Sequence, residues 1–274
     1  MYFVLVTLCT CFNMFLGLLS LYLALCGQPF WAAWALLASV CFDACDGYLA
    51  RKWGVASEFG AQLDSLADFA SFCLAGGVLA YAWAAAQGAG DFSLAQASDY
   101  QSGLWGVGQA LVQGGDWVGY SFPPLKGEIH YLFLGAIFLY TCLGGMRLAR
   151  YNAQTDSLCP PSFFDGLPTT GAAALIAIFC LADFMAPPSW WEWSPGGVLL
   201  LTVILGLLMF SHCPYPKVTK IDWLPRWAWF TPLAAAFLTL PGSAYLFAGL
   251  YLVSGPLYSW YQSQWRKDSP EAGK

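Results

Sequence analysis

Four aspartates lie close together in the first quarter of a strongly hydrophobic chain. Asp43 and Asp46 are three residues apart, and Asp64 and Asp68 are four apart, so each pair shares one face of a helix. An aspartate at the centre of a membrane helix costs roughly 2.5–3.5 kcal/mol on insertion scales. Four carboxylates that converge in such a protein are typical of a site for hard divalent cations and phosphoryl chemistry.

Ion pairing within the protein is the alternative explanation for these acids. It would need several basic partners, but only Arg51 and Lys52 are close in the sequence. Four negative charges against two positive ones leave an excess that bound metal ions would neutralise. We therefore expect all four aspartates to be metal ligands, with Arg51 left to bind an anion.

Small residues share the faces of the aspartates. Gly47 and Ala50 follow the first pair at helical spacing, and Gly60 lies one turn before Asp64. Glycine and alanine are also ordinary packing residues in membrane helices. Beside the acids, however, their missing side chains leave room for a ligand to approach the backbone, and we expect them to contact one.

The composition indicates the class of protein that holds this motif. Of the 274 residues, 58% are hydrophobic and only 10% are charged, whereas soluble domains carry about 25% charged residues. We expect an all-α integral membrane protein. Ten cysteines without Cys-x-x-Cys spacing are interpreted as apolar packing residues. With only His130 and His212 present, a histidine-based metal centre or catalytic triad is disfavoured.

Eight apolar segments are each near the ~20 residues that cross a bilayer. The predicted transmembrane helices cover residues 3–26, 30–50, 60–86, 130–149, 166–186, 195–212, 226–241 and 243–262. The first lacks a basic n-region, so we expect a retained helix and not a cleaved signal. Residues 1–265 would form one catalytic domain, with an extracytoplasmic loop at 87–129 that contains a short interfacial helix near 103–113. Residues 266–274 would form a cytoplasmic tail.

The distribution of positive charge predicts the orientation of the helices. With both termini inside, ten of the eleven Lys and Arg residues fall in cytoplasmic segments, and only Lys126 falls outside. Such a bias favours cytoplasmic termini. The second predicted helix then ends, and the third begins, at the cytoplasmic face, so the aspartates are accessible from the cytoplasm.

The segment from Asp43 to Asp68 resembles, at every fixed position, the signature of the CDP-alcohol phosphotransferases. These integral membrane enzymes move a substituted phosphate from a CDP-linked donor to an alcohol. The resemblance implies the helical bundle of that family, a homodimer, and two Mg²⁺ or Mn²⁺ ions on the four aspartates. It implies Asp64 and Asp68 as catalytic residues, with Asp68 taking the proton of the acceptor hydroxyl. The residues implied to contact the CDP-lipid are Asp43, Gly47, Ala50, Arg51 and Gly60.

Three later segments, all on the predicted cytoplasmic side, narrow the choice of acceptor. Residues 147–152, 164–171 and 209–217 resemble, in this order, blocks of the bacterial and archaeal phosphatidylserine synthases. The resemblance implies transfer of phosphatidyl from CDP-diacylglycerol to L-serine with release of CMP. It also implies location in a bacterial or archaeal cytoplasmic membrane.

Arg147, Arg150 and Asn152 are the candidate acceptor-binding residues. A guanidinium binds a carboxylate such as that of serine through two parallel hydrogen bonds. Asp165 and Thr169 are further candidates, as partners for the ammonium or the hydroxyl of serine. Interfacial arginines are also common topological anchors, and the phosphates of the donor compete for the same side chains.

Other substrates and one other class of protein are compatible with the motif. Glycerol phosphate, inositol or an ether-lipid donor would use the same chemistry, although a phosphorylated acceptor would need more basic residues. A cation-coupled transporter also has acids within the membrane. The position of the acids at one membrane face, with Arg51 among them, disfavours a transporter. Nucleic acid is not an expected partner.

Overall fold

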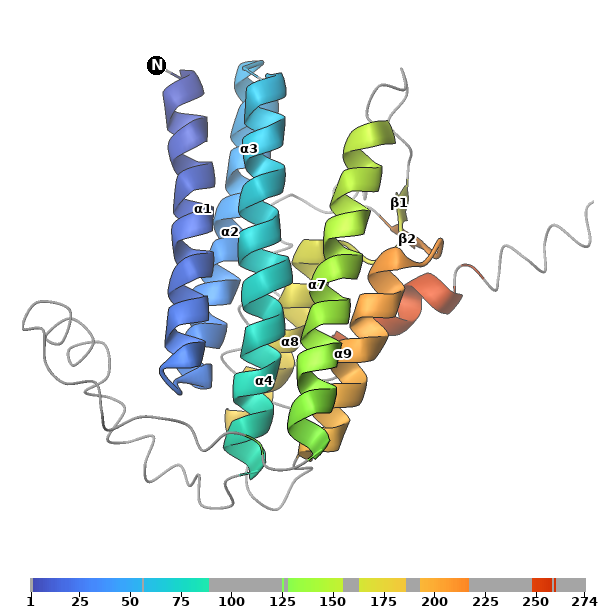
Figure 1. Ribbon diagram of the computed structural model, residues 1–274. Helices are drawn as coiled ribbons and strands as arrows, with labels where there is room; N and C mark the ends of the chain where they lie inside the picture. The colour runs from blue at the N-terminus through green and yellow to red at the C-terminus, as the bar shows by residue number, and fades with distance from the viewer. Residues whose placement is uncertain are drawn as a thin grey trace, which may run out of the picture.

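The computed structural model of the protein describes residues 2–55, 57–88, 125, 128–154, 163–185, 193–216, 248–257 and 259. Most of these residues form an elongated bundle of helices (Figure 1). In chain order the elements are α1 (Tyr2–Leu25), α2 (Pro29–Trp53), α3 (Glu58–Asp68), the π-helix η1 (Phe69–Leu74), α4 (Ala75–Gly88), α7 (Glu128–Gln154), β1 (Phe163–Asp165), α8 (Thr169–Met185), α9 (Pro195–Phe210) and β2 (Pro214–Pro216).

The length and composition of the helices confirm that this is an integral membrane protein. Among the described residues, four helical stretches are long and apolar enough to cross a membrane: Tyr2–Leu25, Pro29–Trp53, Glu58–Gln87 and Glu128–Ala153. Three further apolar helices are shorter, namely Thr169–Met185, Pro195–Phe210 and Ala248–Leu257. The predicted helix 226–241 and the interfacial helix near 103–113 lie outside the described residues. The arrangement with eight spans therefore stays a prediction.

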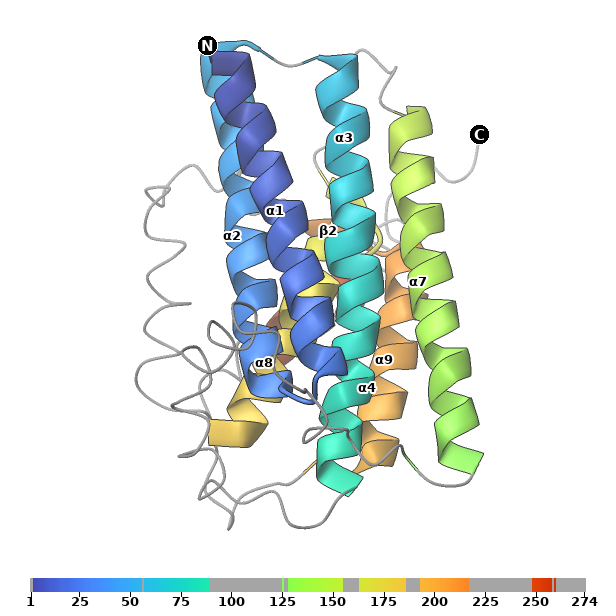
Figure 2. The ribbon, with the colours of Figure 1, turned by 60° about the vertical axis from the view of Figure 1, so that its left-hand side comes forward.

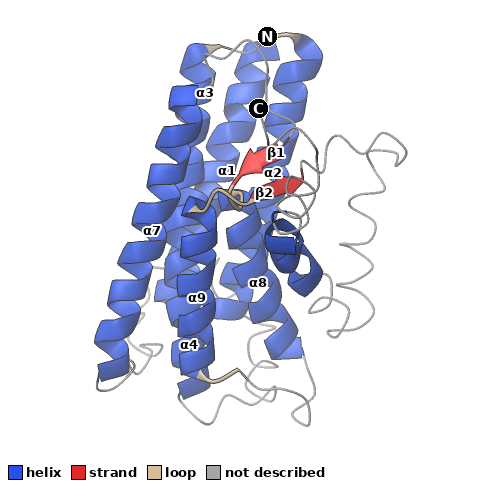
Figure 3. Cartoon of the chain, turned by 90° about the vertical axis from the view of Figure 1, so that its right-hand side faces the viewer, coloured by secondary structure: helices blue, strands red, loops and turns tan. Residues whose placement is uncertain are grey.

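The described residues refine two local details of the prediction. Helix α7 continues to Gln154, beyond the predicted end at residue 149, so Arg150 and Asn152 lie on its last turns. The helical fold class agrees with the prediction of an all-α protein, and the described residues add one short antiparallel pair, β1 and β2, of three residues each. Figure 3 shows this strand pair beside the bundle.

A short turn reverses the chain between α2 and α3 (Figure 2). Helix α2 ends at Gly54, whose left-handed φ of 62° lets its N–H donate to the carbonyl of Ala50. Helix α3 begins after Ser57, whose side chain accepts a hydrogen bond from the N–H of Gly60. Because the two helices run in opposite directions from this turn, the aspartates near its two sides come together.

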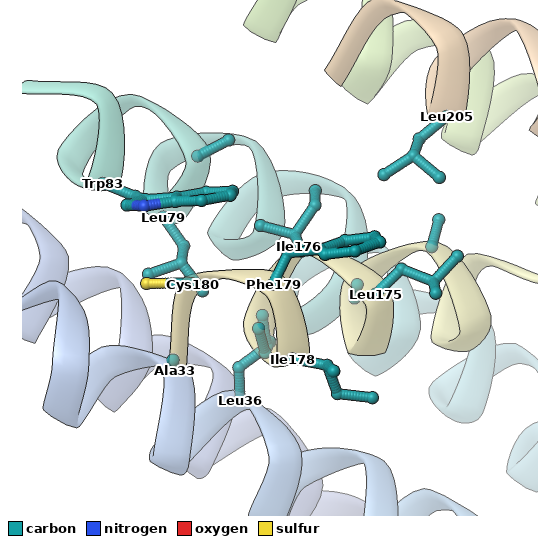
Figure 4. Close-up of a cluster of buried hydrophobic side chains, with 14 of the residues drawn as sticks. Ala33, Leu36, Leu79, Trp83, Leu175, Ile176, Ile178, Phe179, Cys180 and Leu205 are labelled. Atoms are coloured by element: carbon teal, nitrogen blue, oxygen red, sulfur yellow. The ribbon is translucent and has the colours of Figure 1, made fainter. Parts of the chain in front are cut away.

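The apolar core is centred on α8 (Figure 4). Although α8 has only 17 residues, most of its side chains are buried, and Ile176 and Cys180 have no exposed surface. Leu36 of α2 and Trp83 of α4 are equally buried in this core. Large apolar side chains on the outside of the bundle, such as Phe15 of α1, are the expected lipid-facing residues of a membrane protein.

Candidate active site

Three of the four aspartates meet between α2 and α3. Each of Asp43, Asp64 and Asp68 offers a carboxylate oxygen, and these oxygens all lie within 4.8 Å of one another. Asp43 comes from α2, and the other two come from successive turns of α3. All three side chains are partly buried. The spacing along the two helices therefore brings like charges together, as the sequence predicts.

Asp46 lies outside this three-residue group but close to it. Its side chain is 3% exposed and interacts with the hydroxyl of Thr10 on α1 and with the charge of Asp64. The structure thus places the fourth aspartate beside Thr10 of α1, outside the group that the other three form.

Several carboxylate oxygens in the site lack hydrogen-bond partners among the described residues. These buried atoms are Oδ2 of Asp46, Oδ1 of Asp64 and Oδ1 of Asp68. A buried anionic oxygen without a partner is costly, and a cation is the usual partner for a group of them. Carboxylate oxygens are the ligands that Mg²⁺, Mn²⁺ and other hard cations prefer. The donor set therefore fits a divalent metal ion.

The side chain of Arg51 folds back along α2 toward the aspartates. Its Nη1 atom lies 3.3 Å from the point where a Cβ atom on Gly47 would be. The charge of Arg51 acts on Asp43, Asp46 and Asp64, although the side chain itself is exposed. Gly47 thus provides the space in which the guanidinium approaches the acids.

Two of the predicted ligand-contacting residues also have local structural functions. The N–H of Gly60 is the donor to the Ser57 cap of α3, at 3.1 Å. The carbonyl of Ala50 accepts the hydrogen bond that closes the end of α2. Gly60 and Ala50 therefore help to shape the turn between α2 and α3, in addition to their predicted contact with a ligand.

Arg147 approaches the aspartates from α7. It is 7% exposed, its Nη1 donates to the hydroxyl of Thr169 at 3.5 Å, and its charge acts on Asp68. Thr169 is the first residue of α8. A buried guanidinium is thus held between Asp68 and the start of α8.

The other two acceptor candidates contact different helices. Arg150 donates to the carbonyl of Phe210 at 3.5 Å, and its guanidinium carbon lies 5.5 Å from the centre of that ring. Asn152 donates through Nδ2 to the hydroxyl of Ser65 at 2.9 Å. The three candidates therefore contact α8, α9 and α3 respectively. Ser65, next to Asp64, was not among the predicted site residues, and only its adjacency to that acid signals a role.

Two of the three later sequence segments, residues 164–171 and 209–217, contact each other beside the bundle. The N–H of Gly166 donates to the carbonyl of Cys213 at 2.9 Å, and that of Leu167 donates to Leu208 at 3.0 Å. Tyr215 then reaches the helix Ala248–Leu257, where its hydroxyl donates to the carbonyl of Leu252. Burial raises the pKa of Tyr215, so its phenol stays protonated and able to donate. The side chain of Asp165, another acceptor candidate, lies outside the described part of the chain.

Comparison with known proteins agrees with the motif. The model of the CDP-alcohol phosphatidyltransferase family matches residues 3–95, which include all four aspartates. A CDP-diacylglycerol–serine O-phosphatidyltransferase of Helicobacter pylori is 30% identical over 255 residues, which are 90% of this chain and 86% of the relative. The chain belongs to the CDP-alcohol phosphatidyltransferase family.

Relatives from archaea share this likeness. A CDP-diacylglycerol–serine O-phosphatidyltransferase of Methanocaldococcus jannaschii is 28% identical over 79% of this chain and 78% of its own length. An archaetidylserine synthase of Methanothermobacter thermautotrophicus is 26% identical over 74% of this chain and 65% of its own length. The match to the Helicobacter pylori relative covers 90% of the chain, so that similarity includes the later blocks as well as the aspartates.

Proposed function

We propose that this member of the CDP-alcohol phosphatidyltransferase family transfers the phosphatidyl group of CDP-diacylglycerol to L-serine and releases CMP. The observation that carries the proposal is the meeting of Asp43, Asp64 and Asp68 within 4.8 Å, with buried oxygens that lack partners. The names of the relatives from Helicobacter pylori and Methanocaldococcus jannaschii support the choice of donor and acceptor.

The four aspartates are proposed to hold two divalent ions, Mg²⁺ or Mn²⁺. When bound, such ions offset the charge of a pyrophosphate and stabilise the leaving phosphate. The protein itself contributes the carboxylates at fixed positions, and Asp46 supports the group from the side of α1.

Residues of this chain then bind and orient the substrates. Asp68 is proposed to take the proton of the serine hydroxyl as that oxygen attacks the β-phosphate of the donor. The backbone at Gly47, Ala50 and Gly60, with Asp43, is proposed to contact the CDP moiety. Arg51, exposed beside the acids, is proposed to pair with a phosphate of the donor.

The acceptor site is proposed to include Arg147, Arg150 and Asn152. Arg147 is the best candidate to bind the serine carboxylate, because its buried guanidinium lies between Asp68 and Thr169. Arg150 and Asn152 would form the walls of the site through their contacts with α9 and Ser65. A carboxylate held by Arg147 would bring the serine hydroxyl toward Asp68.

The surrounding architecture is proposed as one catalytic domain of residues 1–265 with eight membrane spans. Both termini and the active site would face the cytoplasm, residues 266–274 would form a tail, and residues 87–129 would lie outside. The positive-charge bias of the sequence supports this orientation. The acyl chains of the donor would remain in a bacterial or archaeal cytoplasmic membrane, and the protein would act as a homodimer.

An assay of the purified protein with a panel of labelled alcohols tests the proposal. Serine should give phosphatidylserine and CMP, whereas inositol and glycerol phosphate should react much more slowly. The likeness to an archaetidylserine synthase makes an ether-linked CDP-lipid the second donor to include. Product from inositol or glycerol phosphate, with none from serine, would show that the proposed acceptor is wrong.

A further inference from the structure

The helix that carries Asp64 and Asp68 changes its geometry immediately after Asp68. Helix α3 ends there, and the next six residues, Phe69–Leu74, form the π-helix η1. The N–H of Ala75 donates to the carbonyl of Ala70, five residues back, where an α-helix would use the carbonyl four residues back. Short π-helical insertions are rare and often occur at functional sites.

The extra residue of a π-turn changes the direction in which α3 points its side chains. Each residue of an α-helix turns the chain by about 100°, so one inserted residue rotates α3 relative to α4 by about that angle. Helix α4 is held in the core by fully buried side chains such as Leu79 and Trp83. The register of η1 therefore determines whether Asp64 and Asp68 face Asp43 on α2.

Two hydroxyl groups of α7 donate hydrogen bonds to the backbone of η1. The Tyr140 hydroxyl donates to the carbonyl of Phe72 at 3.3 Å, and the Thr141 hydroxyl donates to the carbonyl of Cys73 at 3.2 Å. Tyr140 is completely buried. Within a membrane, backbone groups released by a change in helix type need partners from neighbouring side chains, because water is absent.

Glycines on both sides provide the room that the wider π-helix needs. A Cβ atom on Gly17 of α1 would lie 2.4 Å from the Cβ of Ser71. A Cβ atom on Gly144 of α7 would lie 2.5 Å from the sulfur of Cys73. Helices α1 and α7 therefore contact η1 more closely than residues with side chains would permit.

We propose that Tyr140 and Thr141 are positioning residues for the metal site. Their hydroxyls hold η1 in its π-helical register and thereby direct the carboxylates of Asp64 and Asp68 toward the divalent cation. This inference rests on the proposed metal site, but it assigns the geometry of that site to α7, a helix that contributes no carboxylate to it.

Binding of Mn²⁺ to the purified full-length protein in detergent, measured by electron paramagnetic resonance, tests this role directly. Tyr140→Phe and Thr141→Val each remove one hydroxyl with little change in volume. Each should weaken Mn²⁺ binding by about three- to tenfold, the effect expected for one lost hydrogen bond. Thr141→Ser keeps a hydroxyl and should bind like the parent. Tyr131→Phe, on the exposed side of α7, is the matched control for tyrosine.

Thermal unfolding of the same samples shows whether a variant loses Mn²⁺ affinity because its site is misplaced or because the whole protein is less stable. Unchanged Mn²⁺ affinity in both Tyr140→Phe and Thr141→Val would overturn the inference. Equal losses of affinity in Thr141→Val and Thr141→Ser would also overturn it, because the hydroxyl would then not be the cause. If Tyr140→Phe does not fold, the comparison of the two Thr141 variants decides. A parent protein that binds no Mn²⁺ would instead refute the metal site of the proposed function.

Discussion

At the scale of single residues, the site combines acids that repel one another with one buried guanidinium. Asp43, Asp64 and Asp68 lie within 4.8 Å, and Arg147 faces them from α7. The exposed Arg51 is accessible to a large donor such as a CDP-lipid, whereas the buried Arg147 is accessible only to a small ligand. This difference in burial leads us to assign Arg147 to the small acceptor and Arg51 to the phosphates of the lipid.

The assignment of Arg147 predicts a selective effect on serine. Arg147→Lys loses the paired hydrogen bonds to a carboxylate, which are worth about 1.5–3 kcal/mol. The KM for serine should therefore rise by roughly ten- to a hundredfold, with a much smaller change in the KM for CDP-diacylglycerol. Steady-state kinetics with each substrate varied in turn measures both constants.

Two comparisons keep this prediction specific. Arg150→Lys should have the smaller effect on serine, because Arg150 stacks on Phe210 at the end of α9. Serinol, which lacks the carboxylate, should be a poor acceptor for the parent enzyme. Equal reactivity of serinol and serine, or an Arg147 variant that changes only the donor KM, would show that Arg147 serves the donor phosphates.

At the scale of the elements, the site depends on how helices start, end and change register. The turn between α2 and α3 brings the two aspartate pairs together, and η1 sets the direction of the second pair. Outside the long helices, Gly166 joins the strand β1 to α8. Its φ of +79° lies in the left-handed region, and it packs closely against backbone carbonyl oxygens at the end of α9.

Gly166 should not tolerate a side chain. A Cβ atom there would lie 2.5 Å from the carbonyl oxygen of Met209, and the backbone is in the left-handed region. Gly166→Ala should lower the stability by about 1–3 kcal/mol. Gly196→Ala, at a helical position with open space around it, should be neutral or slightly stabilising. Thermal unfolding in detergent compares the two, and equal midpoints would contradict the role of Gly166.

The sequence predicts the aspartate group well because its geometry is local. The four-residue spacing places Asp64 and Asp68 on one helix face, and only the reversal between α2 and α3 is needed to bring Asp43 to them. Asp46, however, lies outside the group despite its three-residue spacing from Asp43. The π-helix could not be predicted in this way. Its register depends on Tyr140, Thr141 and Gly144, which are distant in the sequence and reach η1 only in the folded bundle.

The acceptor residues show the same limit of sequence reasoning. Arg147, Arg150 and Asn152 are close in the sequence, yet they contact Thr169, Phe210 and Ser65 on three different helices. Side chains that project from one helix end at different angles contact different neighbouring helices, and the polar groups of those helices determine the partner. Spacing along α7 indicates a polar helix end, but it does not tell which ligand each side chain reaches.

At the scale of the whole molecule, the fold places a polar site in an apolar bundle. In the part of the chain that the structure describes, four stretches have the length and composition of membrane spans, and a core around α8 joins them. The basic residues predict that the end of the bundle with the aspartates faces the cytoplasm. A cytoplasmic site would give water-soluble serine and CMP free access while the lipid donor stays in the bilayer.

Labelling from each side of the membrane tests this orientation. Single cysteines at Ser98 and Ser269, in a background without accessible native cysteines, should react with an impermeant reagent from opposite sides. Ser269 should become accessible only after the membrane is opened. Labelling of both positions from the same side would contradict the arrangement with eight spans and cytoplasmic termini.

We propose that the grouped aspartates catalyse a metal-dependent transfer of phosphatidyl to serine. The most direct measurement is the formation of phosphatidylserine from CDP-diacylglycerol and labelled serine by the purified protein. Activity should vanish in EDTA and return with Mg²⁺ or Mn²⁺. Asp64→Asn, which removes one ligand charge, should lower the rate by about a hundredfold or more. Glu58→Gln, an exposed acid at the start of α3, should be unaffected. Full activity in EDTA, or in Asp64→Asn, would show that these aspartates do not catalyse a metal-dependent transfer.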